Sequence, residues 1–102
     1  MPSITVDDLE WDDDNERECR DHGFSPEIAL EVLMGPVRFF PNKPRRTGTH
    51  MMIGPDSTQR CWTIPIVPTS TQGRWRTITG YPAADSEMEL YENQLRRETR
   101  RW

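Results

Sequence analysis

The stretch WDDDNERECRDHGFSPEIALEVL, residues Trp11–Leu33, decides the fold class of this chain. Asp12–Asp14 supply an N-cap and a negative first turn, which stabilise the positive end of a helix dipole. His22 and Gly23 end that helix near Asp21, because glycine tolerates the left-handed conformation that often follows a helix. The segment therefore predicts a short helix followed by a tight corner.

A second helix is expected immediately after the corner. Ser25 is the predicted N-cap, and Pro26 takes the first helical position, where its missing N–H costs nothing. Apolar residues then recur at helical spacing through Ile28–Leu33, and Gly35-Pro36 ends the helix. This pattern predicts a helix with one face on the core.

Short apolar segments separated by turn residues predict strands in the rest of the chain. These strands are an N-terminal arm at 4–9 and the segments Val37–Phe40, Thr49–Gly54, Arg60–Val67 and Arg74–Tyr81. Pro65 falls inside its strand, so we expect it at a sheet edge or a bulge, since proline donates no ladder hydrogen bond.

A long C-terminal helix closes the chain, with Ser86 and Glu89 as its predicted capping box. The length of 102 residues fits a single domain, residues 1–102. The order of elements predicts an α+β fold: a small, mostly antiparallel sheet with two N-terminal helices and one C-terminal helix.

Charge is distributed unevenly along a chain whose net charge is −4. The balance of charged residues is −9 over 1–34, +6 over 35–84 and −1 over 85–102. A polyanion would therefore meet the basic middle segment. The alternative is that the acidic and basic segments attract each other within the fold, and the sequence leaves both readings open.

Several classes of protein do not fit this composition. No apolar run approaches the roughly 20 residues that span a bilayer, and the acidic start does not resemble a secretion signal. Cys19 and Cys61 form no CxxC pair or Cys/His cluster, which favours a reduced compartment. The carboxylates of Asp12–Asp14 point around a helix axis rather than toward one ion. We expect a cytoplasmic protein without membrane partner, cofactor or metal.

Short motifs recur in a defined order along residues 9–95. They are Trp11-Asp12, His22-Gly23, Ile28–Leu33, Ile53-Gly54, Arg74-x-Arg76-x-Ile78-Thr79, Glu89 and Tyr91. In this order they resemble the BrnT-type toxins of type II toxin–antitoxin systems, whose fold is similar to that of RelE-like bacterial ribonucleases. The resemblance implies a RelE/BrnT-like fold and a metal-independent ribonuclease. Its expected partners are RNA and a neutralising cognate antitoxin, for which a ribbon-helix-helix protein is one option; a homodimer is compatible with the sequence.

Metal-free RNA cleavage needs a base for the 2′-hydroxyl, donors for the phosphate charge and an acid for the leaving oxygen. Guanidinium groups match phosphate oxygens, and a histidine titrates near neutrality. The predicted catalytic residues are Arg76, His50, Arg60 and Thr79, and the predicted substrate-binding residues are Arg74, Arg45, Arg46 and Tyr81.

The last predicted strand also supports a second interpretation. It reads RWRTITGY where the toxin families typically read R-x-R-x-I-S-A-R, so no arginine stands at position 81. Strict strand alternation places Arg74 and Arg76 on one face and Tyr81 on the other, unless the strand bulges. The alternative is a non-catalytic BrnT-like module that binds protein or nucleic acid. Trp62 and Trp75 either stack bases or build the core.

Overall fold

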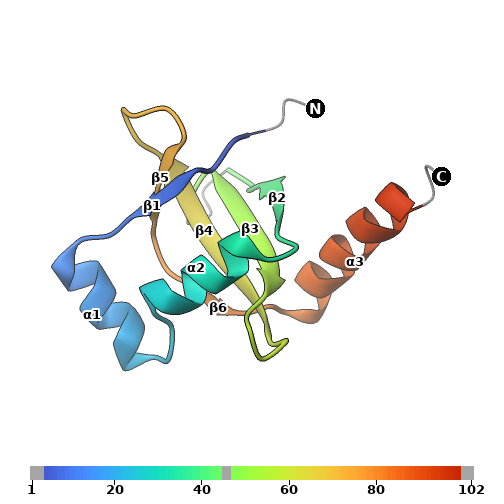
Figure 1. Ribbon diagram of the computed structural model, residues 1–102, viewed down its shortest axis with the longest axis horizontal. Coiled ribbons are helices and arrows are strands. Elements are labelled where there is room, and N and C mark those ends of the chain that lie inside the picture. Colours follow the sequence, from blue (N-terminus) through green and yellow to red (C-terminus); the bar gives the residue numbers. More distant parts are fainter. Residues whose placement is uncertain (1–3, 45–46, 100–102) are drawn as a thin grey trace.

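The computed structural model describes residues 4–44 and 47–99, and within them the chain forms three helices and six strands. The elements in chain order are β1 (Asp8–Glu10), α1 (Asp13–Asp21), α2 (Pro26–Met34), β2 (Arg38–Pro41), β3 (His50–Pro55), β4 (Cys61–Pro68), β5 (Arg74–Thr77), β6 (Tyr81–Pro82) and α3 (Asp85–Thr99). The strands form one open sheet in the order β1-β5-β4-β3-β2, and β6 pairs with β4 beyond the end of β5 (Figure 1). Only the β1–β5 pair is parallel among the described strands, so the predicted α+β class is confirmed.

Both N-terminal helices begin at their predicted caps. The Asp12 carboxylate accepts the backbone N–H of Asn15 at 2.7 Å, and the Ser25 hydroxyl accepts that of Ile28 at 3.2 Å. Gly23 has a φ of 89°, the left-handed conformation expected after a helix. Asp12 is therefore a helix cap, as the sequence indicated.

The start of α3 differs from the prediction. Glu87, not Glu89, completes the cap by accepting the backbone N–H of Ala84 at 2.8 Å, and the helix begins at Asp85. The predicted Ser86–Glu89 box was wrong because Ala84, at the true cap position, has no side-chain oxygen that would mark it in the sequence. The hydroxyl of Tyr91 donates to the Pro36 carbonyl at 2.6 Å and ties α3 to the segment before β2.

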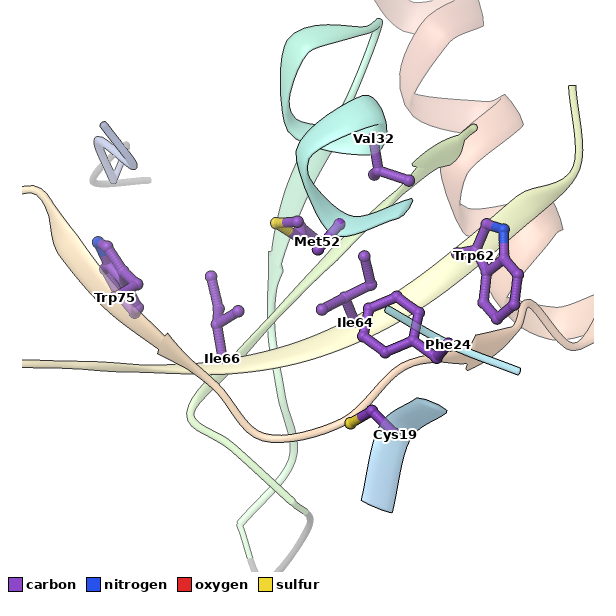
Figure 2. Close-up of a cluster of buried hydrophobic side chains, with 9 residues drawn as sticks. Cys19, Phe24, Val32, Met52, Trp62, Ile64, Ile66 and Trp75 are labelled. Atoms are coloured by element: carbon purple, nitrogen blue, oxygen red, sulfur yellow. The ribbon is translucent and has the colours of Figure 1, made fainter. Parts of the chain in front are cut away.

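The two faces of the sheet are covered differently. We call them the α2 face, which carries Trp62, Ile64 and Ile66 of β4, and the α3 face, which carries Thr63, Pro65 and Val67. On the α2 face, Figure 2 shows a continuous cluster of Cys19, Phe24, Val32, Met52, Trp62, Ile64, Ile66 and Trp75. On the α3 face, α3 covers a smaller cluster of Phe40, Ile53 and Tyr91. Trp62 and Trp75 are thus core residues rather than a platform for bases.

Among residues 4–44 and 47–99, no helix combines the length and the apolar character needed to cross a bilayer.

Candidate functional site

The predicted catalytic residues do not converge on one point. His50 pairs with Ile66 across the sheet, whereas Arg76 pairs with Val67. Neighbouring residues of a strand point to opposite faces, so these two side chains lie on opposite sides of the sheet. The His50 ring meets the edge of the Trp75 ring on the α2 face, with 5.1 Å between ring centroids. His50 and Arg76 therefore cannot act together on one phosphate.

Arg60 lies in a structural turn between β3 and β4. Its guanidinium group stacks on Trp62, 4.9 Å from the ring centroid. The Trp62 ring nitrogen in turn donates to Asp56 at 2.8 Å. Burial opposes ionisation of Asp56, but hydrogen bonds from Thr58, Trp62 and the backbone outweigh it and lower its pKa from 3.8 to about 2. Arg60 comes six residues before Ile66, the sheet partner of His50, which corresponds to roughly 20 Å at the usual rise of a strand. Arg60 is therefore far from both His50 and Arg76.

Acidic residues of the N-terminal segment pair with the two arginines of β5. Arg74 lies 3.6 Å from a carboxylate oxygen of Asp8, and Arg76 hydrogen bonds the carboxylate of Asp12. Each of these side chains remains partly exposed to solvent, where an ion pair contributes little stability. Two interpretations of the uneven charge were open, binding of a polyanion and attraction between segments of the chain. At Arg74 and Arg76 the acidic N-terminal segment and the basic middle segment attract each other.

The predicted strand Arg74–Tyr81 is interrupted by a bulge. Thr77 pairs with Ile66 and Tyr81 pairs with Thr63, so the chain advances four residues against three on β4. The extra residue lies within 78–80, opposite Pro65. The Pro65 carbonyl accepts the backbone N–H of Ile78 at 3.1 Å, but the proline nitrogen has no hydrogen to donate. The expectation of an edge or a bulge at Pro65 is confirmed.

The bulge places Tyr81 on the α3 face. Thr63, its partner, lies on the same face of β4 as Val67, the partner of Arg76. The sequence predicted opposite directions for Tyr81 and Arg76 unless the strand bulges. The bulge is present, so the two residues share a face. Gly80 makes this path possible, since a Cβ atom at this position would lie 2.4 Å from a ring carbon of Phe24.

A groove of about 630 Å³ opens on the α3 face beside Tyr81, and we call it the α3 groove. It lies between the loop that follows β2, the middle of β3 and β4, and the first turns of α3. Its lining residues are Pro41, Asn42, Lys43, Thr47, Met51, Pro65, Thr79, Tyr81, Ala84, Ser86, Glu87 and Leu90. The volume lies in the range of sites that bind small molecules.

Polar and charged groups on the groove walls could support proton transfer. The Tyr81 hydroxyl donates to one oxygen of Glu87 at 2.9 Å, while the other oxygen accepts the Ala84 N–H. Lys43 contributes a positive charge, whereas the hydroxyl of Thr79, another lining residue, hydrogen bonds the Cys19 thiol. The groove thus holds a proton acceptor, a hydroxyl donor and a cation on one surface.

The two cysteines are not arranged as nucleophiles. Burial raises the pKa of the Cys19 thiol, and a hydrogen bond from Thr79 only partly offsets it. Burial also raises the pKa of Cys61, and the nearby charge of Glu92 adds to the effect. Because the thiolate is the reactive form, the raised pKa of both thiols disfavours a nucleophilic role.

The structure brings together two of the eight predicted site residues. Thr79 and Tyr81 line the α3 groove, and Arg76 lies on the same face of the sheet. Arg74 lies on β5 beside β1. His50 lies on the opposite face, and Arg60 lies in the turn before β4. The predicted substrate-binding residues Arg45 and Arg46 lie outside the described residues.

Sequence reasoning missed Lys43 and Glu87. The sequence predicts Glu89 as the carboxylate of the capping box, so Glu87, which takes that place in the structure, had no predicted role. Lys43 was overlooked beside Arg45 and Arg46, although it begins the same basic loop. Pro65 is the sequence signal that points to both residues. A bulge opposite Pro65 turns Tyr81 toward the loop that carries Lys43 and toward the start of α3, which carries Glu87.

Comparisons with models of protein families, with curated proteins and with solved structures found no match to this chain. The resemblance to BrnT-type toxins therefore stays a prediction that rests on the sequence motifs. Within residues 4–44 and 47–99, no group of three or more His, Cys, Asp or Glu could hold a metal ion.

Proposed function

We propose that this protein is a BrnT-like toxin that cleaves RNA without a metal ion, and that the α3 groove is its site. The observation that carries the proposal is the bulge at 78–80, which turns Tyr81 to the face of Arg76 and into a groove with Thr79. Bulges often redirect a side chain beside a functional site. The α+β architecture is also the one that the resemblance implies.

The groove supplies the groups that this reaction needs. Glu87 is the general base that removes the proton of the 2′-hydroxyl. In the free protein a Glu87 carboxylate oxygen accepts a hydrogen bond from the Tyr81 hydroxyl at 2.9 Å. The substrate replaces the hydrogen bond between Tyr81 and Glu87, and the 2′-oxygen attacks the phosphorus atom. As the bond from phosphorus to the 5′-oxygen breaks, the Tyr81 hydroxyl protonates that leaving oxygen, and a 2′,3′-cyclic phosphate remains. Lys43 stabilises the charge that develops on the phosphate.

A cognate antitoxin would neutralise the protein by covering the α3 groove, since an occupied groove cannot admit RNA. Arg76 lies next to the groove along the same face, where it could hold a neighbouring phosphate if it exchanged Asp12 for that ligand. Phosphate contacts of this kind supply most of the affinity of proteins for RNA and depend strongly on salt.

Induced expression in bacteria tests this proposal. The wild-type chain should arrest growth, and Lys43→Ala should relieve the arrest because the groove loses its cation. Arg17→Ala is the matched control, since it removes an exposed cation of α1 outside the groove and should leave the arrest unchanged. Full growth on wild-type expression, with soluble and folded protein present, would contradict the toxin proposal.

The ion pairs of Arg74 and Arg76 favour a second candidate, the non-catalytic binding module. Carboxylates of the same chain occupy both arginines, and a net charge of −4 does not help a protein to grip RNA. This candidate predicts no RNA cleavage at any protein concentration and partner binding that persists after Arg76→Ala. Titration of RNA cleavage against protein concentration separates it from the toxin.

A further inference from the structure

A second hollow is lined by residues of β1 and α2, away from the α3 groove. Figure 1 shows β1 and α2, the two elements that border it. Its volume is about 220 Å³, and its lining residues are Asp7, Asp8, Leu9, Trp11, Pro26, Leu30 and Leu33. We call it the β1–α2 hollow. None of its residues belongs to the α3 groove, so it is independent of the proposed ribonuclease site.

Exposed apolar side chains continue from this hollow along α2. Leu30 is 53% exposed and Met34 is 78% exposed. The two residues are four positions apart, which places them one above the other on the outer side of the helix. The core side of α2 is formed by Ala29 and Val32, both fully buried, so the outer side contributes nothing to the core. Apolar side chains grouped in this way beside a hollow mark interaction surfaces.

The surroundings of the hollow are acidic. Asp7 and Asp8 form part of its wall, and residues 1–34 carry a charge balance of −9. Arg74 of β5 lies 3.6 Å from Asp8 and balances one of these two wall carboxylates. Arg20, at the end of α1, is already paired with Glu16 at 3.0 Å and with Glu27 at 2.9 Å. The field around the hollow therefore repels nucleic acid and attracts positively charged groups.

We propose that the β1–α2 hollow is a docking site for a basic segment of a partner protein, with one large apolar side chain inserted between Trp11 and Leu30. Lysines and arginines on both sides of that anchor would face Asp7 and Asp8, the latter in exchange for its present ion pair with Arg74. The apolar anchor supplies most of the affinity, while the charges set the orientation and raise the association rate. The site does not depend on the proposed cleavage of RNA.

Fluorescence anisotropy with a labelled peptide tests the proposal. The probe carries one leucine with lysines and arginines on both sides of it, and it should bind the wild-type protein with an affinity that falls as salt is added. Leu30→Ser should weaken binding at least about fivefold, because the anchor loses an apolar contact. Asp7→Asn should weaken binding less and reduce the dependence on salt.

Three controls decide whether the binding is the one proposed. Met88→Ser removes an exposed apolar side chain of α3 and should leave the affinity unchanged. A peptide with glutamates in place of its basic residues should not bind. Equal binding of the probe to wild type and Leu30→Ser, or no binding to the wild type, would overturn the proposal. A concentration-dependent dimer that Leu30→Ser dissociates would overturn it as well, because a second copy would then occupy the hollow.

Discussion

The two faces of one sheet differ in how completely they are covered. The α2 face is closed by α2 and the corner before it, and Phe24, Ile64 and Ile66 are fully buried there. The α3 face is covered over part of its width by α3, and beside that helix the α3 groove lies open. The buried core and the proposed functional site therefore occupy opposite sides of the same strands. Substitutions on the α2 face should change folding, and substitutions in the groove should change activity.

The largest expected effect is the loss of a core side chain on the α2 face. Phe24 is fully buried and its ring packs against Trp11 and Trp62. Phe24→Ala should lower the free energy of unfolding by about 3–5 kcal/mol, through lost apolar contact and a residual cavity. Urea denaturation followed by circular dichroism measures this.

The matched substitution on the α3 face is Leu90→Ala, which removes a side chain that is 42% exposed. It should change the free energy of unfolding by less than about 1 kcal/mol. Equal losses from Phe24→Ala and Leu90→Ala would show that the two faces do not differ in the way described.

An effect smaller than that of Phe24→Ala is expected from protonation of Asp56, in the turn between β3 and β4. Asp56 has a pKa of about 2 in the folded protein, below its usual 3.8. The ionised carboxylate therefore stabilises the fold at any pH above about 4, and this contribution is lost as the pH falls toward 2. The loss should be roughly 2 kcal/mol.

Urea denaturation at about pH 6 and about pH 2 checks this, with Asp56→Asn as the comparison. The variant should be less stable than the wild type at the higher pH, because an amide nitrogen cannot accept the bond from Trp62. It should also lose less stability on acidification. A variant with the same pH dependence as the wild type would assign the acid loss to other carboxylates.

The smallest effect on stability is expected where the N-terminal segment meets β5. Asp12→Asn keeps a good helix cap and removes the charge that pairs with Arg76, so unfolding should change by less than about 1 kcal/mol. The freed Arg76 should bind RNA more tightly, which a filter-binding assay at low salt would detect. Unchanged RNA affinity would mean that Arg76 takes no part in the α3-face site.

Much of the fold could be predicted because its signals are local. The caps at Asp12 and Ser25 and the glycine at position 23 are each read from a few neighbouring residues, and both helices formed as expected. Pro65 likewise predicted a sheet edge or a bulge, because proline has no backbone N–H to donate, and the structure has a bulge opposite it. These features depend on backbone chemistry rather than on distant contacts.

The candidate site was less predictable because its geometry is not local. The face of Tyr81 depends on where the extra residue falls, and that is fixed by the fit of Gly80 against Phe24, 56 positions earlier. His50 and Arg76 looked compatible as residue types, but their sheet partners place them on opposite faces. Pairing register, which the sequence does not state, decided both outcomes.

The most direct test of the central claim is cleavage of single-stranded RNA by the purified protein in the presence of EDTA. The wild type and Arg17→Ala should cleave equally. Tyr81→Phe should keep the fold and lose about a hundredfold in rate, the usual contribution of a general acid. Cleavage by Tyr81→Phe at the wild-type rate would contradict the claim that the bulge turns Tyr81 into the functional site.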